Sequence, residues 1–230
     1  MSMFTPEELT AIGLSLKVAI VAALASLPPG IACGWLLARR RFPGKALLDA
    51  LLHLPLVMPP VVTGYALLVV LGTQGPMGSW LLEHLGIQFA FRWTGAALAC
   101  AVMGFPLMVR AIRLSIEATD RRLEAAAATL GAGPWRVFFS ITLPLAWPGL
   151  VAGMVLAFAK ALGEFGATIT FVSNIPGETQ TLSSAIYGLM QVPGMESGIW
   201  RLAGVALAIS LAALLLSEWL VRRPHPREDT

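Results

Sequence analysis

Five apolar segments, each bounded by charged residues, constrain what this chain of 230 residues can fold into. A helix that crosses the hydrocarbon core of a bilayer needs roughly 20 predominantly apolar residues. The segments are long enough for this, or nearly so, and they cover residues 12–37, 54–71, 93–109, 143–172 and 202–221. A mean hydropathy of +0.75 with only 13% charged residues is typical of integral membrane proteins. The sequence therefore predicts one all-α domain over residues 1–230, a membrane bundle of five spans.

A polar segment over residues 174–198 is the main alternative to a count of five spans. Its middle, residues 181–191, is expected to form a short amphipathic helix that lies at the outer surface or dips into the membrane. A sixth crossing here would place the carboxyl-terminal basic residues outside, so five spans are favoured. Residues 45–54 are another place where a further membrane-associated helix is possible.

Basic residues gather on one side of the predicted bundle. Twelve of the 16 Lys and Arg residues follow the first, third or fifth segment, and short basic loops stay in the cytoplasm. They are Arg39, Arg40, Arg41, Lys45, Arg110, Arg113, Arg121, Arg122, Arg136, Arg222, Arg223 and Arg227. The amino terminus has two acids and no base, so no cleavable signal peptide is expected. We therefore expect the amino terminus outside and the carboxyl terminus in the cytoplasm.

Proline is frequent within the apolar segments. The positions are Pro28, Pro29, Pro55, Pro59, Pro60, Pro106 and Pro148. Proline removes a backbone donor and bends a helix, which lipid tolerates only where the freed carbonyl group finds another partner. Two interpretations stay open: ordinary packing kinks, or helices that splay and close around a polar path.

Residues 118–142, which this topology places in the cytoplasm, have the pattern of two short water-soluble helices. Asp120 is placed to cap the first helix and Glu124 to lie in its first turn, whereas Gly131 and Gly133 end it. Pro134 suits the start of a second helix. The first helix has an apolar stripe of Leu123, Ala126, Ala127 and Leu130, and the second brings Trp135, Phe138 and Phe139 to one face. Such short helices are marginal in water, so both faces need the rest of the chain or a soluble partner to pack against.

This stretch resembles the cytoplasmic EAA loop of importer permeases in the ATP-binding-cassette (ABC) superfamily. The family pattern is Glu-Ala-Ala, three residues, Gly, nine residues, then Ile-x-Leu-Pro. The chain departs from it at Ala125, where the pattern has Glu, and carries the acid one residue earlier. By resemblance, this loop couples the permease to an ATPase. The residues implied in coupling are Glu124, Ala125, Ala126, Ala127, Gly131, Ala132, Ile141, Leu143 and Pro144.

The resemblance covers most of the chain. Residues 39–65, 105–145 and 162–182 are similar to the molybdate branch of the sulfate and molybdate permeases. It implies the ABC importer permease (MetI-like) fold and a homodimer in the cell inner membrane. It also implies two cytoplasmic ATPase subunits, which hold ATP and magnesium, and an external, periplasmic molybdate-binding protein. The implied mechanism is alternating access, in which closure of the ATPase pair moves the EAA loops and the proline-bent spans open or close the path.

Two ionisable residues lie deep in the fourth segment, at Lys160 and Glu164. Their spacing of four residues predicts an ion pair, because intramembrane charges usually pair or face water. Three interpretations stay open: a pair that stabilises the structure or a gate, a Lys160 that attracts a passing dianion, and a Lys160 that snorkels to the surface. Other groups that can contact an oxoanion, or simply bond neighbouring helices, are Thr63, Thr168, Thr170, Ser173 and Asn174.

Catalytic, cofactor and metal sites are not predicted for this chain. Gly44-Lys45 lacks the upstream glycine of a phosphate-binding loop, so ATP is expected on a partner. Cys33 and Cys100 lie in apolar segments and are expected to be buried hydrophobes. No nucleic-acid module accompanies the basic loops. The alternatives to a molybdate permease are transport of sulfate, thiosulfate or tungstate, a stand-alone secondary transporter, and an intramembrane enzyme, which would need a nucleophile with a base.

Overall fold

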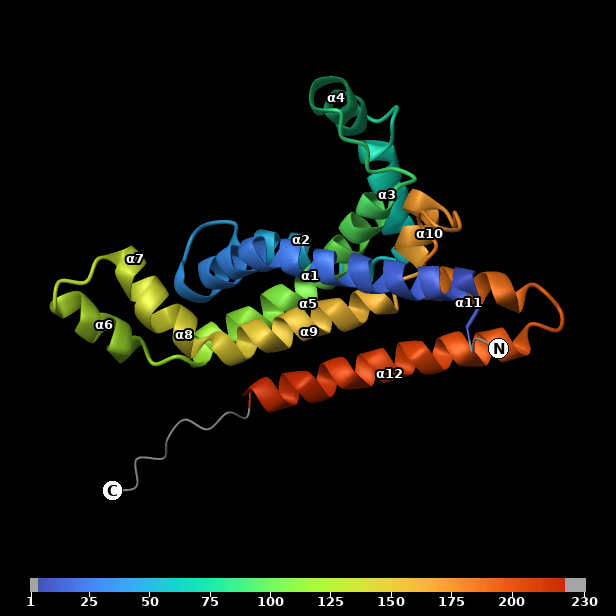
Figure 1. The fold of residues 1–230 in the computed structure, drawn as a ribbon. Coiled ribbons are helices and arrows are strands. Elements are labelled where there is room, and N and C mark those ends of the chain that lie inside the picture. Colours follow the sequence, from blue (N-terminus) through green and yellow to red (C-terminus); the bar gives the residue numbers. More distant parts are fainter. Residues whose placement is uncertain (1–3, 222–230) are drawn as a thin grey trace.

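The computed structural model describes residues 4–221, which form twelve α-helices and one π-helical segment, with no strand among them. Four long helices make up the body: α1 (Pro6–Arg39), α5 (Trp93–Ala118), α9 (Trp147–Leu162) and α12 (Glu196–Val221). Figure 1 shows α1, α5 and α9 packed together, with α12 along one side of α9. The prediction of an all-α fold is confirmed.

Small side chains let the central helices approach closely. The buried core between them is rich in alanine, including Ala19, Ala22, Ala96, Ala99 and Ala161. In lipid the hydrophobic effect does not drive helices together, so association depends on close van der Waals contact, which small residues permit. The alanine content of the apolar segments therefore sets the tight packing of the body.

Three of the described helices, α1, α5 and α12, are long and apolar enough to cross a membrane unaided. Two bent pairs raise the count to as many as five if each pair makes one span. One pair joins α2 (Lys45–Val57) to α3 (Pro60–Leu71) at 111°, and the other joins Pro134–Leu145 to α9 at 67°. The upper count agrees with the five predicted spans.

Consecutive prolines break the second apolar segment. Helix α2 ends at Val57, Met58 is extended, and Pro60 opens α3. Prolines donate no backbone hydrogen bond, and a residue before a proline favours extended backbone. The bend of 111° is far larger than a packing kink, so at this position the kink interpretation is wrong. The further helix considered for residues 45–54 is present as α2.

The prediction of one continuous helix over residues 143–172 is wrong. This segment contains α8 (Leu143–Leu145), α9 and α10 (Gly166–Val172). The break follows from Glu164, whose carboxylate accepts a hydrogen bond from the backbone N–H of Ala167 at 3.0 Å. A side chain that bonds a nearby amide offers the backbone an alternative to the helical ladder. Helix α10 therefore starts anew and packs against α3.

Helices α3 and α10 pack with their backbones almost in contact. A β-carbon added at Gly64 would lie 2.4 Å from the carbonyl oxygen of Ala167. On the other side, a β-carbon added at Gly166 would lie 2.8 Å from the Cβ of Pro60. Helix α10 also joins the buried core, where Phe171 and Val172 pack with residues of α1 and α5, so the α3–α10 pair stands beside the amino-terminal part of α5 (Figure 1). The missing side chain at Gly64 is thus what allows the two broken segments to lock together.

Replacement of Gly64 by alanine is expected to destabilise the protein by about 1–3 kcal/mol, because the added methyl group meets a backbone oxygen that cannot move alone. Thermal unfolding in detergent measures this as a melting temperature lower by roughly 2–4 °C per kcal/mol. Gly204→Ala in α12 is the matched control, since its β-carbon meets nothing within 4 Å. Equal melting temperatures of Gly64→Ala and the wild type would contradict the contact.

Two short helices flank these elements: the predicted α11 (Leu182–Met190) and the unpredicted α4 (Pro76–Leu85). Nine residues of helix cover about 14 Å, so α11 is too short to make a sixth crossing. Helix α4 has Pro76 at its start and ends at Gly86, whose φ is +66°. A proline in the first turn and a glycine just after the last turn are typical of helix ends, so the sequence contained a signal for α4.

Large apolar side chains on α2, α3 and α12 remain exposed. Examples are Val57, Val61, Tyr65, Leu207 and Leu215. Helix α2 has no buried residue and is tied to α5 by an ion pair between Arg113 Nη1 and Asp49 Oδ2, 2.9 Å apart. Such surfaces suit lipid or another subunit. The basic residues Arg222, Arg223 and Arg227 lie outside the described residues, and the orientation of the chain stays a prediction.

Candidate functional site

Residues 118–142 form the two-helix projection that the sequence predicts, at one end of the molecule in Figure 1. Asp120 caps α6 (Arg121–Thr129) by accepting a hydrogen bond from the N–H of Arg122 at 2.9 Å. Gly131 reverses the chain with φ +86°, and Pro134 opens α7 (Pro134–Val137). Helix α7 runs on into η1 (Phe138–Thr142), a π-helical segment that leads to α8. The cap, the glycine turn and the proline start are confirmed.

An aromatic cluster covers α7 and η1. Trp135 and Phe139 stack with ring centroids 6.3 Å apart, and Phe138 meets both rings edge-on. Phe138 also meets Trp35 of α1 edge-on at 5.9 Å. Trp35 thus covers part of Phe138, whereas Trp135 is 75% exposed and Phe139 is exposed as well. The outer half is therefore apolar surface that a partner can bury.

Glu124 points into the protein, toward α1 and η1. Its Oε1 accepts hydrogen bonds from Arg39 Nη2 at 2.9 Å, Arg39 Nε at 3.1 Å and Thr142 Oγ1 at 2.7 Å. The Arg39 side chain is 8% exposed and that of Glu124 is 20% exposed. A carboxylate held by a guanidinium and a hydroxyl is committed to bonds within the chain. The acid that lies one residue out of register thus joins three elements of this chain.

The other residues that are predicted to couple the permease to an ATPase are either exposed or partly covered. Helix α6 has no buried residue, and Ala125, Ala126 and Gly131 are exposed. Ala127, Ala132, Ile141 and Leu143 are partly covered, and Pro144 is exposed. Leu143 packs against the core beside α5 and α9. The exposed small residues of α6 are therefore positions that the backbone of another protein can approach closely.

Lys160 and Glu164 form the ion pair that their spacing predicts. Lys160 Nζ lies 2.5 Å from Glu164 Oε2, while Oε1 of Glu164 accepts the N–H of Ala167. The Glu164 side chain is 1% exposed and that of Lys160 is 29% exposed. A desolvated carboxylate needs such partners. The ion pair supports the paired interpretation of Lys160, whereas snorkelling and attraction for a dianion stay predictions.

The hydroxyl groups of α10 bond mainly to their own helix. Thr168 donates to the carbonyl oxygen of Phe165 at 2.9 Å, and Thr170 donates to that of Gly166 at 2.8 Å. Ser173 ends α10 with φ +66°, and its carbonyl oxygen accepts a hydrogen bond from Thr179. These bonds favour a structural role for the two threonines. Because each hydroxyl hydrogen is already donated within the chain, the hydroxyl oxygens can only accept a hydrogen bond from a solute.

Thr63 and Asn174 differ from the other polar candidates. Thr63 Oγ1 and Asn174 Oδ1 are buried and have no hydrogen-bond partner among the described residues. The amide of Asn174 donates only a long bond, 3.5 Å, to the carbonyl oxygen of Ser184. An unpaired buried polar atom costs about 1–3 kcal/mol, so water or a solute at either atom would be favourable. We expect Thr63 Oγ1, which can donate a hydrogen bond, to contact an oxoanion on the path, whereas Asn174 Oδ1 can only accept a hydrogen bond, as from water.

Sequence reasoning missed Arg39, Thr142 and Ser183. Ser183 Oγ of α11 donates to the carbonyl oxygen of Leu162 at 3.1 Å, where α9 ends. No local pattern links Arg39 at the end of α1 to Glu124, which lies 85 residues further along the chain. Thr142 stands at the unspecified position of the Ile-x-Leu-Pro pattern, so the pattern gave no signal for it.

Comparison with known proteins places the chain among transport proteins. Residues 30–226 match the model of the family described as "Binding-protein-dependent transport system inner membrane component". The chain is 62% identical over 225 residues to the "Molybdenum transport system permease protein ModB" of Escherichia coli strain K12, with 98% of each chain covered. It is 58% identical to the protein of the same name from Haemophilus influenzae, with 94% of each covered.

The fold also matches a solved transporter. A bacterial alginate ABC transporter in complex with an alginate pentasaccharide-bound periplasmic protein has a chain that superposes with a TM-score of 0.71. The alignment covers 95% of this chain and 81% of that chain, at 19% sequence identity. At this identity the likeness concerns the fold alone, and it agrees with the all-α bundle of Figure 1.

Proposed function

Because this chain belongs to the family of binding-protein-dependent transport system inner membrane components, we propose that it is the permease through which an ABC importer takes up molybdate. The observation that carries the proposal is the close relation, over nearly the whole chain, to permeases named for molybdenum transport. No observation favours sulfate, thiosulfate or tungstate over molybdate. The path is built from this chain in the inner membrane, and the site residues named above are candidates for it.

We further propose that two copies of the chain enclose the path. The support is the uncovered apolar surface on α2 and α3, including Val57, Val61 and Tyr65. This surface lies on the outside of a single copy, where a second copy can cover it. In the dimer, Thr63 of α3 lies near the junction with α10 and close to the path.

In this proposal, partner proteins supply the energy for transport and select the substrate. Two cytoplasmic ATPase subunits dock on α6 and on the exposed aromatic side chains of α7 and η1, and they carry out ATP hydrolysis with bound magnesium. This chain then has no catalytic role. An external binding protein delivers the oxoanion at the opposite face, where α11 lies. The amino terminus is outside and the carboxyl terminus is cytoplasmic.

Uptake by cells tests the substrate. A strain without this chain is expected to lose high-affinity uptake of labelled molybdate and to regain it when the chain is supplied on a plasmid. A hundredfold excess of tungstate or molybdate should compete, whereas the same excess of sulfate should not. Competition by sulfate as strong as that by molybdate would contradict a transporter selective for molybdate, and unchanged molybdate uptake without the chain would contradict the substrate itself.

A further inference from the structure

Helix α6 has unusually few apolar contacts with the rest of the described chain. It has no buried residue, and it packs only lightly against α7 and η1, which follow it in the sequence. A surface helix normally transmits force through an apolar face packed on its neighbours. Motion of α6 must therefore reach the membrane helices through something other than core packing.

Three polar bridges connect the region of α6 to the cytoplasmic end of α1. Arg39 of α1 bonds the Glu124 carboxylate through Nε and Nη2, and Nη2 also donates to the carbonyl oxygen of Thr119 at 3.3 Å. In the opposite direction, Arg121 Nη2 donates to the carbonyl oxygen of Ala38 at 3.3 Å. Thr142 of η1 bonds the same oxygen of Glu124. Charge-assisted bonds of this kind are about twice as strong as neutral ones and hold a fixed geometry.

Helix α1 carries this connection across the molecule. It runs unbroken for 34 residues despite Pro28 and Pro29 inside it. About 36 Å along the helix from Arg39, Ser15 Oγ accepts a hydrogen bond of 2.6 Å from the N–H of Leu182 at the start of α11. Seven residues further on, Glu8 Oε1 lies 2.7 Å from Arg201 Nη2 of α12. Figure 1 shows α1 reaching from the side of α7 to the side of α11.

We propose that the Glu124–Arg39 pair, together with Thr142, is a positioning device that couples α6 to α1, so that α1 transmits motion from the ATPase side to the outer face. This inference rests on the proposed function and names the residues through which the coupling loop acts. Glu124 is then a link inside the permease and makes no essential contact with the ATPase. Arg39 receives the motion, and α11 is moved through Ser15.

The test uses the complete complex in lipid vesicles, with its ATPase subunits and loaded binding protein, and measures molybdate imported per ATP hydrolysed. Glu124→Gln is expected to lower this ratio about fivefold or more, the size of a typical coupling between sites, while the ATPase stays bound. The double variant Arg39→Glu with Glu124→Arg should restore part of the ratio. Glu117→Gln is the matched control, because within residues 4–221 its carboxylate pairs only with Arg113 on the same helix.

An unchanged ratio in Glu124→Gln would overturn the inference. Loss of ATPase binding in Glu124→Gln would also overturn it, because Glu124 would then be a docking residue. If Glu124→Gln does not accumulate in the membrane, Thr142→Val decides, since it keeps the Arg39 pair and removes the bond of 2.7 Å. A ratio lowered about twofold or more in Thr142→Val supports the relay, and an unchanged ratio overturns it. Failure of the wild-type complex to import molybdate would count against the proposed function alone.

Discussion

Replacement of Lys160 by methionine is expected to destabilise the protein by about 3 kcal/mol, because it leaves the buried Glu164 carboxylate without its cation. The side chain of Glu164 is 1% exposed, so water cannot replace the lost partner. The hydrogen bond from Ala167 N–H remains, but one neutral donor does not balance a full charge. In detergent, a loss of this size lowers the melting temperature by roughly 6–12 °C.

Two further variants separate this effect from a simple loss of side-chain volume. Lys160→Met combined with Glu164→Gln should recover much of the melting temperature, because the uncharged amide needs no cation. Lys17→Met is the matched control in another span, where Lys17 Nζ lies 3.6 Å from the centre of the Trp93 ring. Its removal leaves no charge behind and should cost only about 1 kcal/mol. Equal melting of Lys160→Met and the wild type would contradict the buried pair.

Replacement of Trp135 by alanine is expected to weaken ATPase binding about 30-fold or more, the effect of losing one interface hot spot. Trp135 is 75% exposed although it stacks on Phe139, so the chain itself leaves most of the ring uncovered. Tryptophan at the centre of an apolar patch is the kind of side chain that dominates binding energy. Titration of ATPase subunits onto the permease in detergent or nanodiscs measures the change.

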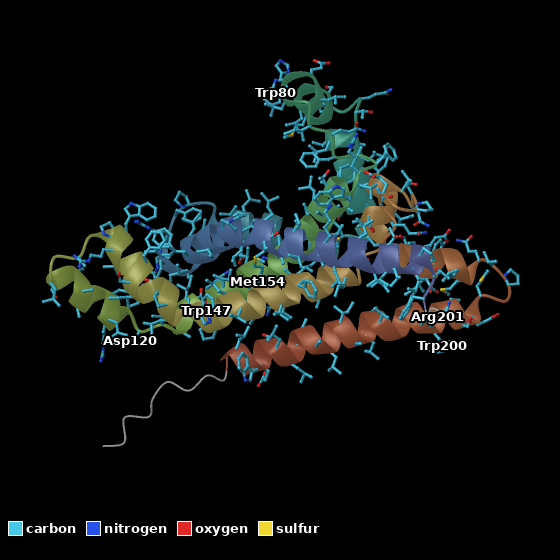
Figure 2. All side chains as sticks on the ribbon, viewed as in Figure 1. Trp80, Asp120, Trp147, Met154, Trp200 and Arg201 are labelled. Atoms are coloured by element: carbon cyan, nitrogen blue, oxygen red, sulfur yellow. The ribbon has the colours of Figure 1, made fainter. Side chains whose placement is uncertain are left out.

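Trp80→Ala is the matched control for Trp135→Ala. Trp80 is also an exposed tryptophan on a short helix, and it stacks on His84 with ring centroids 5.0 Å apart. Figure 2 shows Trp80 on α4, far from the end of the molecule where Asp120 opens α6. ATPase affinity should be unchanged in Trp80→Ala. A similar loss in both variants would mean that Trp135 has no specific docking role.

Local signals predicted the elements whose geometry depends on near neighbours in the sequence. Asp120 and Gly131 were placed correctly, because an N-cap and a left-handed glycine turn are decided within a few residues. The pair of Lys160 and Glu164 also followed from spacing along one helix. Periodicity and caps therefore gave the projection and the ion pair before any tertiary contact was known.

Long-range contacts decided what the sequence could not predict. The position of α10 depends on the close approach that Gly64 of α3 allows. The break between α9 and α10 is different, because it follows a local bond from the Ala167 N–H to the Glu164 side chain that hydropathy does not register. The role of Glu124 depended on Arg39, 85 residues away. Hydropathy treats Gly64, Glu164 and Ala167 as parts of continuous spans, because it averages over a window of residues and takes no account of side-chain partners.

ATP-driven import into vesicles that contain only this chain and its ATPase subunits, with the binding protein outside, tests the central claim most directly. We expect labelled molybdate to accumulate only when ATP reaches the ATPase subunits and the binding protein is present. Vesicles with the permease alone should accumulate none. Accumulation without ATP would mean that the chain transports by itself, and no accumulation with all partners and ATP would contradict its assignment as a molybdate permease.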